Sequence, residues 1–372
     1  MNRAYVYELK PNKLQQEQID NTIGATRFIY NYYLAFKKEL YELEGISINK
    51  GNCYKICNDF LKVAYPFLKD VDSLALAISE INLDRAFTNF FRDKKIGFPR
   101  FKSKEKAKLS YTTNNQKGSI RIIDENHIKI PKLGIVKINM HRSIPNEFII
   151  KSATITKTRA LKYSISILLE KEEIKVEKVK PNKILGIDYS SANLYVDSEF
   201  STCDYNGYYK ANEKKLKKEQ RKLSNCERRS NNYEKQRQKV LRTHNKVSNS
   251  RKDFLHKETR KLANDYDAII IEDINMQNIS QALSLGKPTN DNGFGMFRSF
   301  LKYKLEEKGK HLIKVDKFYP SSKKCSSCGN IKDKLSLNTR IYICEACHTT
   351  IDRDYNAALN IKQEGIRLLS LA

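Results

Sequence analysis

The sequence predicts a multidomain protein that combines an α/β domain with a small β-barrel. Short segments of alternating β-branched residues follow one another between residues 119 and 169, as in barrels and sandwiches. Two apolar segments, 184–188 and 267–273, alternate with helical periodicity, as in an α/β sheet. With 372 residues, of which 40% are hydrophobic, the chain can bury two or three domain cores.

The first third of the chain is predicted to be one strand followed by a helical bundle. Residues 3–9 precede Pro11, and apolar residues then recur every three to four positions up to about residue 92. Two aromatic clusters, 28–36 and 87–91, are interpreted as core, because aromatic stripes at helical spacing usually pack inside a bundle. Stacking of these rings on nucleobases is the alternative.

After Gly97 the period changes, and short strands separated by turn residues are expected. They are Ser119 to Ile123, His127 to Ile130, Gly134 to Met140, Lys151 to Thr158 and Leu161 to Leu169. Together with residues 3–9 they provide enough strand for a small closed barrel into which the helical bundle is inserted. The segment 98–104, Phe-Pro-Arg-Phe-Lys-Ser-Lys, suits a nucleic-acid groove but also a basic surface loop.

The second half of the chain, after a linker at 171–183, is predicted to be an α/β domain with a terminal helix. Its expected strands are 184–188, 193–196, 267–273 and 311–315, and its expected helices include 294–308 and 355–369. Apolar residues at seven-residue steps from Tyr233 to Phe254 predict a helical hairpin, with a break between its helices at 224–232.

The charge of the chain indicates a polyanionic partner. Lys and Arg number 69 against 43 Asp and Glu, a net charge of +26. Residues 210–261 alone hold 19 Lys and Arg and 6 Asp and Glu, half of the whole excess, so one face of the hairpin is expected to contact phosphates.

No apolar run approaches the roughly 20 residues that span a bilayer. No secretory segment opens the chain, so a cytoplasmic protein is expected.

Two C-x-x-C pairs predict a structural zinc site, because this spacing lets four thiolates surround one ion. The four residues are Cys325, Cys328, Cys344 and Cys347. Disulfides or a redox couple are the alternatives, but a reducing compartment disfavours them. The other cysteines, Cys53, Cys57, Cys203 and Cys226, are scattered and are interpreted as ordinary thiols.

Acidic residues at the ends of elements in the α/β domain are candidate metal ligands. Asp188 and Glu272 end apolar strands, and Asp354 precedes the last helix. Such oxygen ligands hold Mg²⁺ or Mn²⁺, and a pair of these ions activates water for phosphodiester cleavage. Because side chains alternate along a strand, only one of Glu272 and Asp273 can join the cluster. Asp352 and Asp354 have an alternative role, because carboxylates at these positions could simply cap the last helix.

Several motifs resemble a known family. They are Gly186-Ile187-Asp188-Tyr189, Ile271-Glu272-Asp273, the stretch 319–329 (YPSSKKCSSCG) and the stretch 352–361 (DRDYNAALNI), with less specific matches at 10–13 and 98–104. In these motifs the chain resembles, nearly end to end, the TnpB proteins. These are RNA-guided nucleases encoded by insertion sequences and similar to the ancestors of type V CRISPR effectors.

The resemblance implies a domain organisation. It implies an RNase H-like RuvC nuclease domain at 183–318 and 349–372, interrupted by a zinc ribbon at 319–348. It also implies a wedge-like β-barrel at 1–12 and 95–180 that carries a helical recognition insertion at 13–94.

The resemblance further implies an activity. Family members bind a guide RNA copied from the transposon end, recognise a short target-adjacent motif in double-stranded DNA and cut both strands at one metal-dependent site, while RNA:DNA pairing selects the sequence. Carried over to this chain, Asp188, Glu272 and Asp354 become the catalytic, magnesium-binding triad. Cys325, Cys328, Cys344 and Cys347 become the zinc ligands.

Three positions depart from the family pattern. Ser190 follows the first acid where Gly is usual, His348 replaces Gly after the fourth cysteine, and Ile351 replaces a common His. Histidine tolerates a left-handed backbone better than most residues, and it is also a possible competing ligand. No acid of the triad is lost, so cleavage is expected.

Three alternatives to a guided nuclease stay open. The intact acids argue against a nuclease-inactive, RNA-guided repressor, and the inserted ribbon argues against a transposase with a similar triad. The lack of a recognition-helix motif argues against a zinc-stabilised DNA-binding module that uses no guide.

Overall fold

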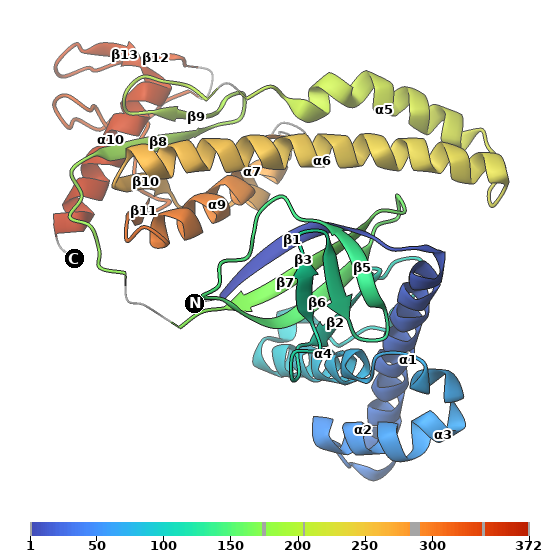
Figure 1. Cartoon of the computed structure of the whole chain (residues 1–372). Helices are drawn as coiled ribbons and strands as arrows, with labels where there is room; N and C mark the ends of the chain where they lie inside the picture. Colours follow the sequence, from blue (N-terminus) through green and yellow to red (C-terminus); the bar gives the residue numbers. More distant parts are fainter. Residues whose placement is uncertain (1, 173–175, 204, 283–290, 337–338, 371–372) are drawn as a thin grey trace. The chain divides into compact units, whose positions relative to one another are not determined.

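The chain folds into two compact units, Met1–Ile174 and Lys175–Ala372. The computed structural model describes residues 2–172, 176–203, 205–282, 291–336 and 339–370 (Figure 1). Each unit has its own sheet and its own hydrophobic core, and the boundary falls in the predicted linker. Among the described helices, none combines the length and the apolar character that a membrane crossing requires.

The first unit is built on a seven-stranded antiparallel sheet. Its strands are β1 Asn2–Lys10, β2 Ser110–Asn114, β3 Arg121–Asp124, β4 His127–Ile130, β5 Gly134–Asn139, β6 Ile149–Lys157 and β7 Tyr163–Glu170, paired in the order β2-β6-β7-β1-β5-β4-β3. Alternate side chains of β7, from Tyr163 to Leu169, are buried in one core. All six expected strands are confirmed, whereas closure into a barrel stays a prediction.

Helices join β1 to the rest of this sheet. They are α1 Lys13–Glu44, α2 Lys50–Ile56, a π-helical turn Cys57–Leu61, α3 Lys62–Ala64, a 3-10 turn Pro66–Lys69, α4 Ser73–Arg92 and a 3-10 turn Lys94–Ile96. α1 begins with a capping box, in which Asn12 and Gln15 exchange side-chain to backbone hydrogen bonds. The aromatic cluster at 28–36 is confirmed as core, with Tyr30 and Tyr33 buried.

The second unit is built on a four-stranded mixed sheet. Its strands are β8 Ile184–Ser190, β9 Leu194–Asp197, β10 Ala268–Glu272 and β11 His311–Val315, in the order β11-β10-β8-β9. β10 runs parallel to β8 and to β11, and only β9 is antiparallel. The helices are α5 Tyr208–Ser224, α6 Asn231–Asp265, α7 Met276–Ala282, α9 Phe294–Glu306 and α10 Arg353–Ser370. The expected α/β domain with a terminal helix is confirmed.

Helices pack on both faces of this sheet, because alternate residues of its buried strands point to opposite sides. Ile269 and Ile271 face α6 and α9 in one core, whereas Ile270 faces Ile361 of α10. α10 lies very close to β8. A Cβ atom added at Gly186 would lie 2.7 Å from Cβ of Lys362, and nearer still to the carbonyl oxygen of Ala358.

The segment before α10 forms a small ribbon. β12 Ile341–Ile343 and β13 Thr350–Asp352 pair antiparallel, and Tyr342 packs against Cys325 and Cys344. β13 leads directly into Arg353, so the ribbon and the start of α10 are joined without a linker.

Candidate metal centres

The four ribbon cysteines form a site with the geometry of a tetrahedral ion. Their sulfur atoms all lie within 4.8 Å of one another, with Cys325 to Cys347 at 3.6 Å and Cys328 to Cys344 at 3.5 Å. Zn–S bonds of about 2.3 Å in a tetrahedron place the sulfurs about 3.8 Å apart, so the pocket fits Zn²⁺ with little adjustment. All eight cysteines of the chain are free thiols.

The two knuckles of this site have the same backbone geometry. Gly329 takes a left-handed φ of 81° and donates its N–H to the carbonyl oxygen of Cys325 at 2.9 Å. His348 takes a φ of 58° and donates to the carbonyl oxygen of Cys344 at 3.1 Å. His348 therefore occupies a position that favours glycine, and it lies outside the ligand set found among the described residues.

Hydrogen bonds to Cys347 favour the thiolate form of its side chain. The Thr349 hydroxyl lies 3.1 Å from its sulfur. Hydrogen bonds from the side chain and backbone of Thr349 lower the pKa of Cys347 to about 6. The thiolate is the metal-binding form of cysteine, so these bonds favour coordination.

The structure brings the three predicted acids into one neighbourhood. Asp188 lies in β8 and Glu272 ends β10, and the register pairs Ile187 with Ile271, so both acids leave the sheet at the same edge. Asp354 lies in the first turn of α10, which packs on β8. Burial raises the pKa of Asp188 well above its ordinary value, and the charges of Glu272 and Asp354 raise it further.

Glu272 and Asp273 point to different surroundings, as strand alternation requires. Glu272 accepts a hydrogen bond from the Ser321 hydroxyl at 2.8 Å, and burial raises its pKa. Asp273 accepts from Lys314 at 2.9 Å and lies 3.7 Å from Arg298, and its pKa is lowered, chiefly by the hydrogen bond from Lys314. Glu272 is therefore the acid of this pair that can share a cation with Asp188.

Asp352 and Asp354 also have different roles. Asp352 accepts hydrogen bonds from the N–H groups of Asp354 at 2.9 Å and Tyr355 at 3.0 Å, so it caps α10. Asp354 instead accepts from the guanidinium of Arg353 at 2.8 and 3.0 Å. The Arg353 guanidinium therefore holds the Asp354 carboxylate, whose charge acts on Asp188.

The two candidate centres differ in how closely their ligands approach. Among the described residues, only the four cysteines form a set of three or more potential ligands whose donor atoms already meet around one point. The three carboxylates offer an all-oxygen donor set that suits Mg²⁺ or Mn²⁺. The mutual repulsion that raises the pKa of Asp188 is relieved by a shared cation, so these residues also fit a metal.

Sequence reasoning missed three polar residues behind the acids. Asn356 and Asn360 on α10 are fully buried, and Ser321 is buried beside Glu272. The sequence holds a signal that could have revealed the two asparagines, because positions 356 and 360 are polar but lie on the apolar face of an amphipathic helix.

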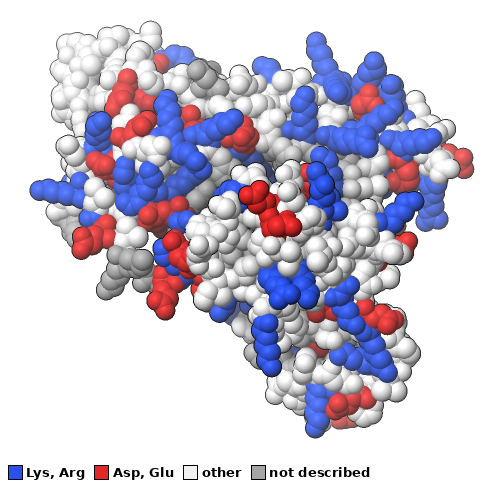
Figure 2. Space-filling model, in the orientation of Figure 1, with Lys and Arg blue, Asp and Glu red and all other residues white. Residues whose placement is uncertain are grey.

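A cationic surface covers the α5–α6 hairpin of the second unit. Figure 2 shows Lys and Arg side chains gathered over this hairpin on the face drawn. A shallow groove on α5 is lined by Lys214, Lys217, Lys218, Arg221, Lys222 and Asn225. The base of α5 is fixed by Asp291, whose carboxylate accepts from the N–H of Tyr209 at 2.8 Å and from Arg251 at 3.2 Å.

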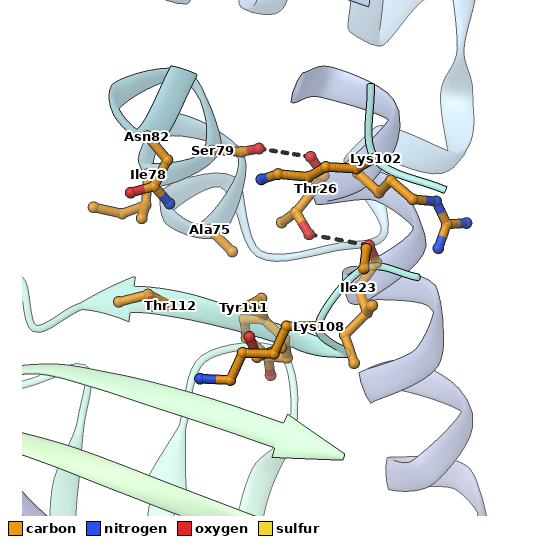
Figure 3. A pocket seen from close by; sticks show the side chains of 13 residues that line it. Ile23, Thr26, Ala75, Ile78, Ser79, Asn82, Lys102, Lys108, Tyr111 and Thr112 are labelled. Atoms are coloured by element: carbon orange, nitrogen blue, oxygen red, sulfur yellow. Dashed lines mark hydrogen bonds between the residues drawn. The ribbon is translucent and has the colours of Figure 1, made fainter. Parts of the chain in front are cut away.

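The first unit contains a pocket of about 230 Å³ between α1, α4 and β2 (Figure 3). Its polar lining includes Ser79, which donates to the carbonyl oxygen of Thr26 at 2.6 Å, and Asn82. The Lys102 ammonium lies 3.6 Å from the Tyr30 ring centroid, and burial lowers the pKa of Lys102. In the same segment Phe98 packs on Phe87 and Phe90, whereas Phe101 is exposed.

Three family models match the chain. Residues 165–283 match OrfB_IS605, described as "Probable transposase", and residues 294–361 match the Cas12f1-like TNB domain. Residues 1–45 match HTH_OrfB_IS605, described as a helix-turn-helix domain, although the structure there contains strand β1 and the single long helix α1.

Relatives resemble this chain over nearly its whole length. A Streptomyces pristinaespiralis protein named "Putative RNA-guided DNA endonuclease" is 28% identical over 98% of this chain and 90% of its own. The Escherichia coli K12 protein named "Putative RNA-guided DNA endonuclease InsQ" is 28% identical over 99% and 93%.

A solved structure shares the fold. The Cas12f1 chain of a cryo-EM complex with sgRNA and target DNA superposes with a TM-score of 0.63 at 16% identity, covering 94% of this chain and 82% of that one. The family models and the full-length relatives agree with the sequence motifs: this chain belongs to the TnpB family, the OrfB proteins of IS605-type elements.

Proposed function

We propose that this protein is an RNA-guided DNA endonuclease that cuts double-stranded DNA beside a short target-adjacent motif by metal-dependent phosphodiester hydrolysis. The observation that carries the proposal is that Asp188 and Glu272 leave adjacent parallel strands at the same edge of the second sheet, while Asp354 begins the helix that packs on β8. Full-length relatives named as RNA-guided DNA endonucleases support it.

In this proposal the second unit is an RNase H-like RuvC domain, at 183–318 and 349–372, with the ribbon 319–348 inserted. Asp188, Glu272 and Asp354 hold Mg²⁺ or Mn²⁺, which when bound activate a water molecule and stabilise the leaving oxygen. Ser321 orients the Glu272 carboxylate, and Arg353 holds that of Asp354. The four ribbon cysteines hold a structural Zn²⁺.

The first unit then supplies the wedge-like barrel, with the helical recognition insertion at 13–94. Its partners in the proposal are the guide RNA from the transposon end and the target duplex. The cationic face of α5 supports phosphate contact in the second unit, because five of the six residues lining its groove are Lys or Arg. Base pairing with the guide selects the sequence, so the protein needs few base-reading side chains.

The proposal is tested with protein purified together with RNA from its own locus. The complex is incubated, with and without Mg²⁺, with a plasmid library that carries a guide-matched target and randomised flanks. We expect Mg²⁺-dependent cutting beside one enriched flanking motif, and a loss of more than about 100-fold on Asp188→Ala or Glu272→Gln, because each removes a carboxylate charge from the proposed metal site.

Asp273→Ala is the matched control, because it removes the neighbouring carboxylate that pairs with Lys314. It should cut at close to the wild-type rate. Cutting that persists in Asp188→Ala refutes the assigned mechanism. Motif-dependent binding by the wild type without cutting would identify the protein as a guided repressor instead.

A further inference from the structure

A buried asparagine of α10, Asn356, holds both neighbours of a cysteine of the candidate zinc site. The side-chain N–H of Asn356 donates to the carbonyl oxygen of Lys324 at 2.7 Å, and its side-chain oxygen accepts from the N–H of Ser326 at 2.9 Å. Lys324 and Ser326 flank Cys325. The orientation of the first knuckle is therefore set by a side chain two residues after Asp354.

Asn360, one turn further along α10, adds a second attachment. Its amide donates to the carbonyl oxygen of Lys324 at 2.6 Å and to that of Ser321 at 2.8 Å. Its own oxygen is buried and has no hydrogen-bond partner among the described residues. A buried acceptor without a partner is unfavourable. The stabilising contribution of the Asn360 side chain therefore comes from its two N–H donors.

Ser321 links this attachment to the carboxylates. Its carbonyl oxygen accepts from Asn360, and its hydroxyl donates to Glu272 at 2.8 Å. A continuous series of hydrogen bonds thus runs from Lys324, the residue before Cys325, through Asn360 and Ser321 to Glu272, while α10 itself carries Asp354.

We propose that Asn356, Asn360 and Ser321 are positioning residues that couple the zinc ribbon to the carboxylate centre, so that the affinity of the carboxylates for a divalent cation depends on zinc occupancy. This inference rests on the proposed function, because it takes the carboxylates to be a cation site. The hydrogen bonds behind a metal ligand fix its orientation, and their loss typically weakens metal binding by about 10- to 100-fold.

The test measures Mn²⁺ binding by electron paramagnetic resonance in protein without nucleic acid, and zinc release with a chromogenic chelator. Asn360→Asp keeps the shape of the side chain but removes its donors. It should speed zinc release and weaken Mn²⁺ binding by about tenfold or more. Ser321→Ala should weaken Mn²⁺ binding while zinc release stays at the wild-type rate. Asn264→Asp adds the same charge beside Lys308 on the surface and should change neither.

Zinc removal from the wild type provides a measurement that needs no variant. Chelation of zinc should weaken Mn²⁺ binding by about tenfold or more, and added Zn²⁺ should restore it. The Asp188→Ala variant measures the Mn²⁺ that binds at other sites, so its signal is subtracted as the background. The coupling is refuted if the Mn²⁺ affinity stays within twofold after zinc removal, or if the wild type binds no Mn²⁺ without nucleic acid. The proposed function fails separately, if Mn²⁺ binds as described but the guided complex does not cut DNA.

Discussion

Gly186→Ala is expected to impair cleavage strongly, because α10 packs directly on β8 at this glycine. The position lies two residues before Asp188 on the strand, and its neighbours Ala358 and Lys362 lie on the helix that carries Asp354. A methyl group at Gly186 therefore pushes apart the two elements whose carboxylates share a cation in the proposed mechanism.

The size of this displacement follows from the packing. The new Cβ would start 2.7 Å from Cβ of Lys362, whereas ordinary van der Waals contact begins at 3.4 Å, so the helix has to move by at least about 0.7 Å, and further to clear the carbonyl oxygen of Ala358. Overpacking of this kind costs about 1–3 kcal/mol of unfolding free energy. A misplacement of about 1 Å between reacting groups costs about 100-fold in rate, so we expect a loss of that order.

The assay is single-turnover plasmid cleavage at saturating Mg²⁺, with the melting temperature measured on the same samples. Gly295→Ala on α9 is the matched control, because a Cβ there meets nothing within 4 Å. It should cut normally and be slightly stabilised. If Gly186→Ala cut at the wild-type rate with an unchanged melting temperature, close packing of α10 on β8 would not position the acids.

Three further predictions concern metal content, salt and pH. Cys344→Ser should release zinc and lower the melting temperature; an unchanged zinc content by mass spectrometry would contradict the ligand assignment. Replacing Lys217, Lys218 and Arg221 with Gln should reduce the log–log salt slope of RNA binding by about 2, and an unaltered slope would exclude them as phosphate contacts. Burial raises the pKa of Glu80 from 4.5 to about 7, so the native first unit holds a proton that the unfolded chain has released. Its unfolding free energy should therefore fall by about 3 kcal/mol between pH 4.5 and 7, and urea unfolding of Glu80→Gln should lack this fall.

The elements predicted most accurately are those whose burial follows a simple period. β11 has the expected bounds, and β10 differs from its expected strand by only one residue at each end, because both are short apolar runs next to turn residues. β2 was not predicted. Its inward-facing residues are Tyr111 and Thr113, and a buried threonine gives no apolar alternation in the sequence.

The acids of the candidate site were predictable, but the residues behind them were not. Each of Asp188 and Glu272 follows an apolar run in the sequence, which already suggests a carboxylate at the edge of a sheet. In the structure Glu272 ends β10, whereas β8 continues past its expected end at Asp188 to Ser190. The bonds from Asn356 and Asn360 to the first knuckle join positions more than 30 residues apart in the chain. Only the tertiary structure reveals which backbone groups those amides reach.

The two ends of α6 are secured very differently. Leu255 and Leu262, near the C-terminal end of α6, belong to the core of the second sheet. Val240 and Val247 lie nearer the tip of the hairpin, which is the turn between α5 and α6. They are buried outside that core, as is Leu216 of α5. The tip of the hairpin therefore has no part in that core, and its like charges repel one another. In the proposed function, a bound polyanion would cancel that repulsion, so nucleic acid would stabilise this hairpin as well as being held by it.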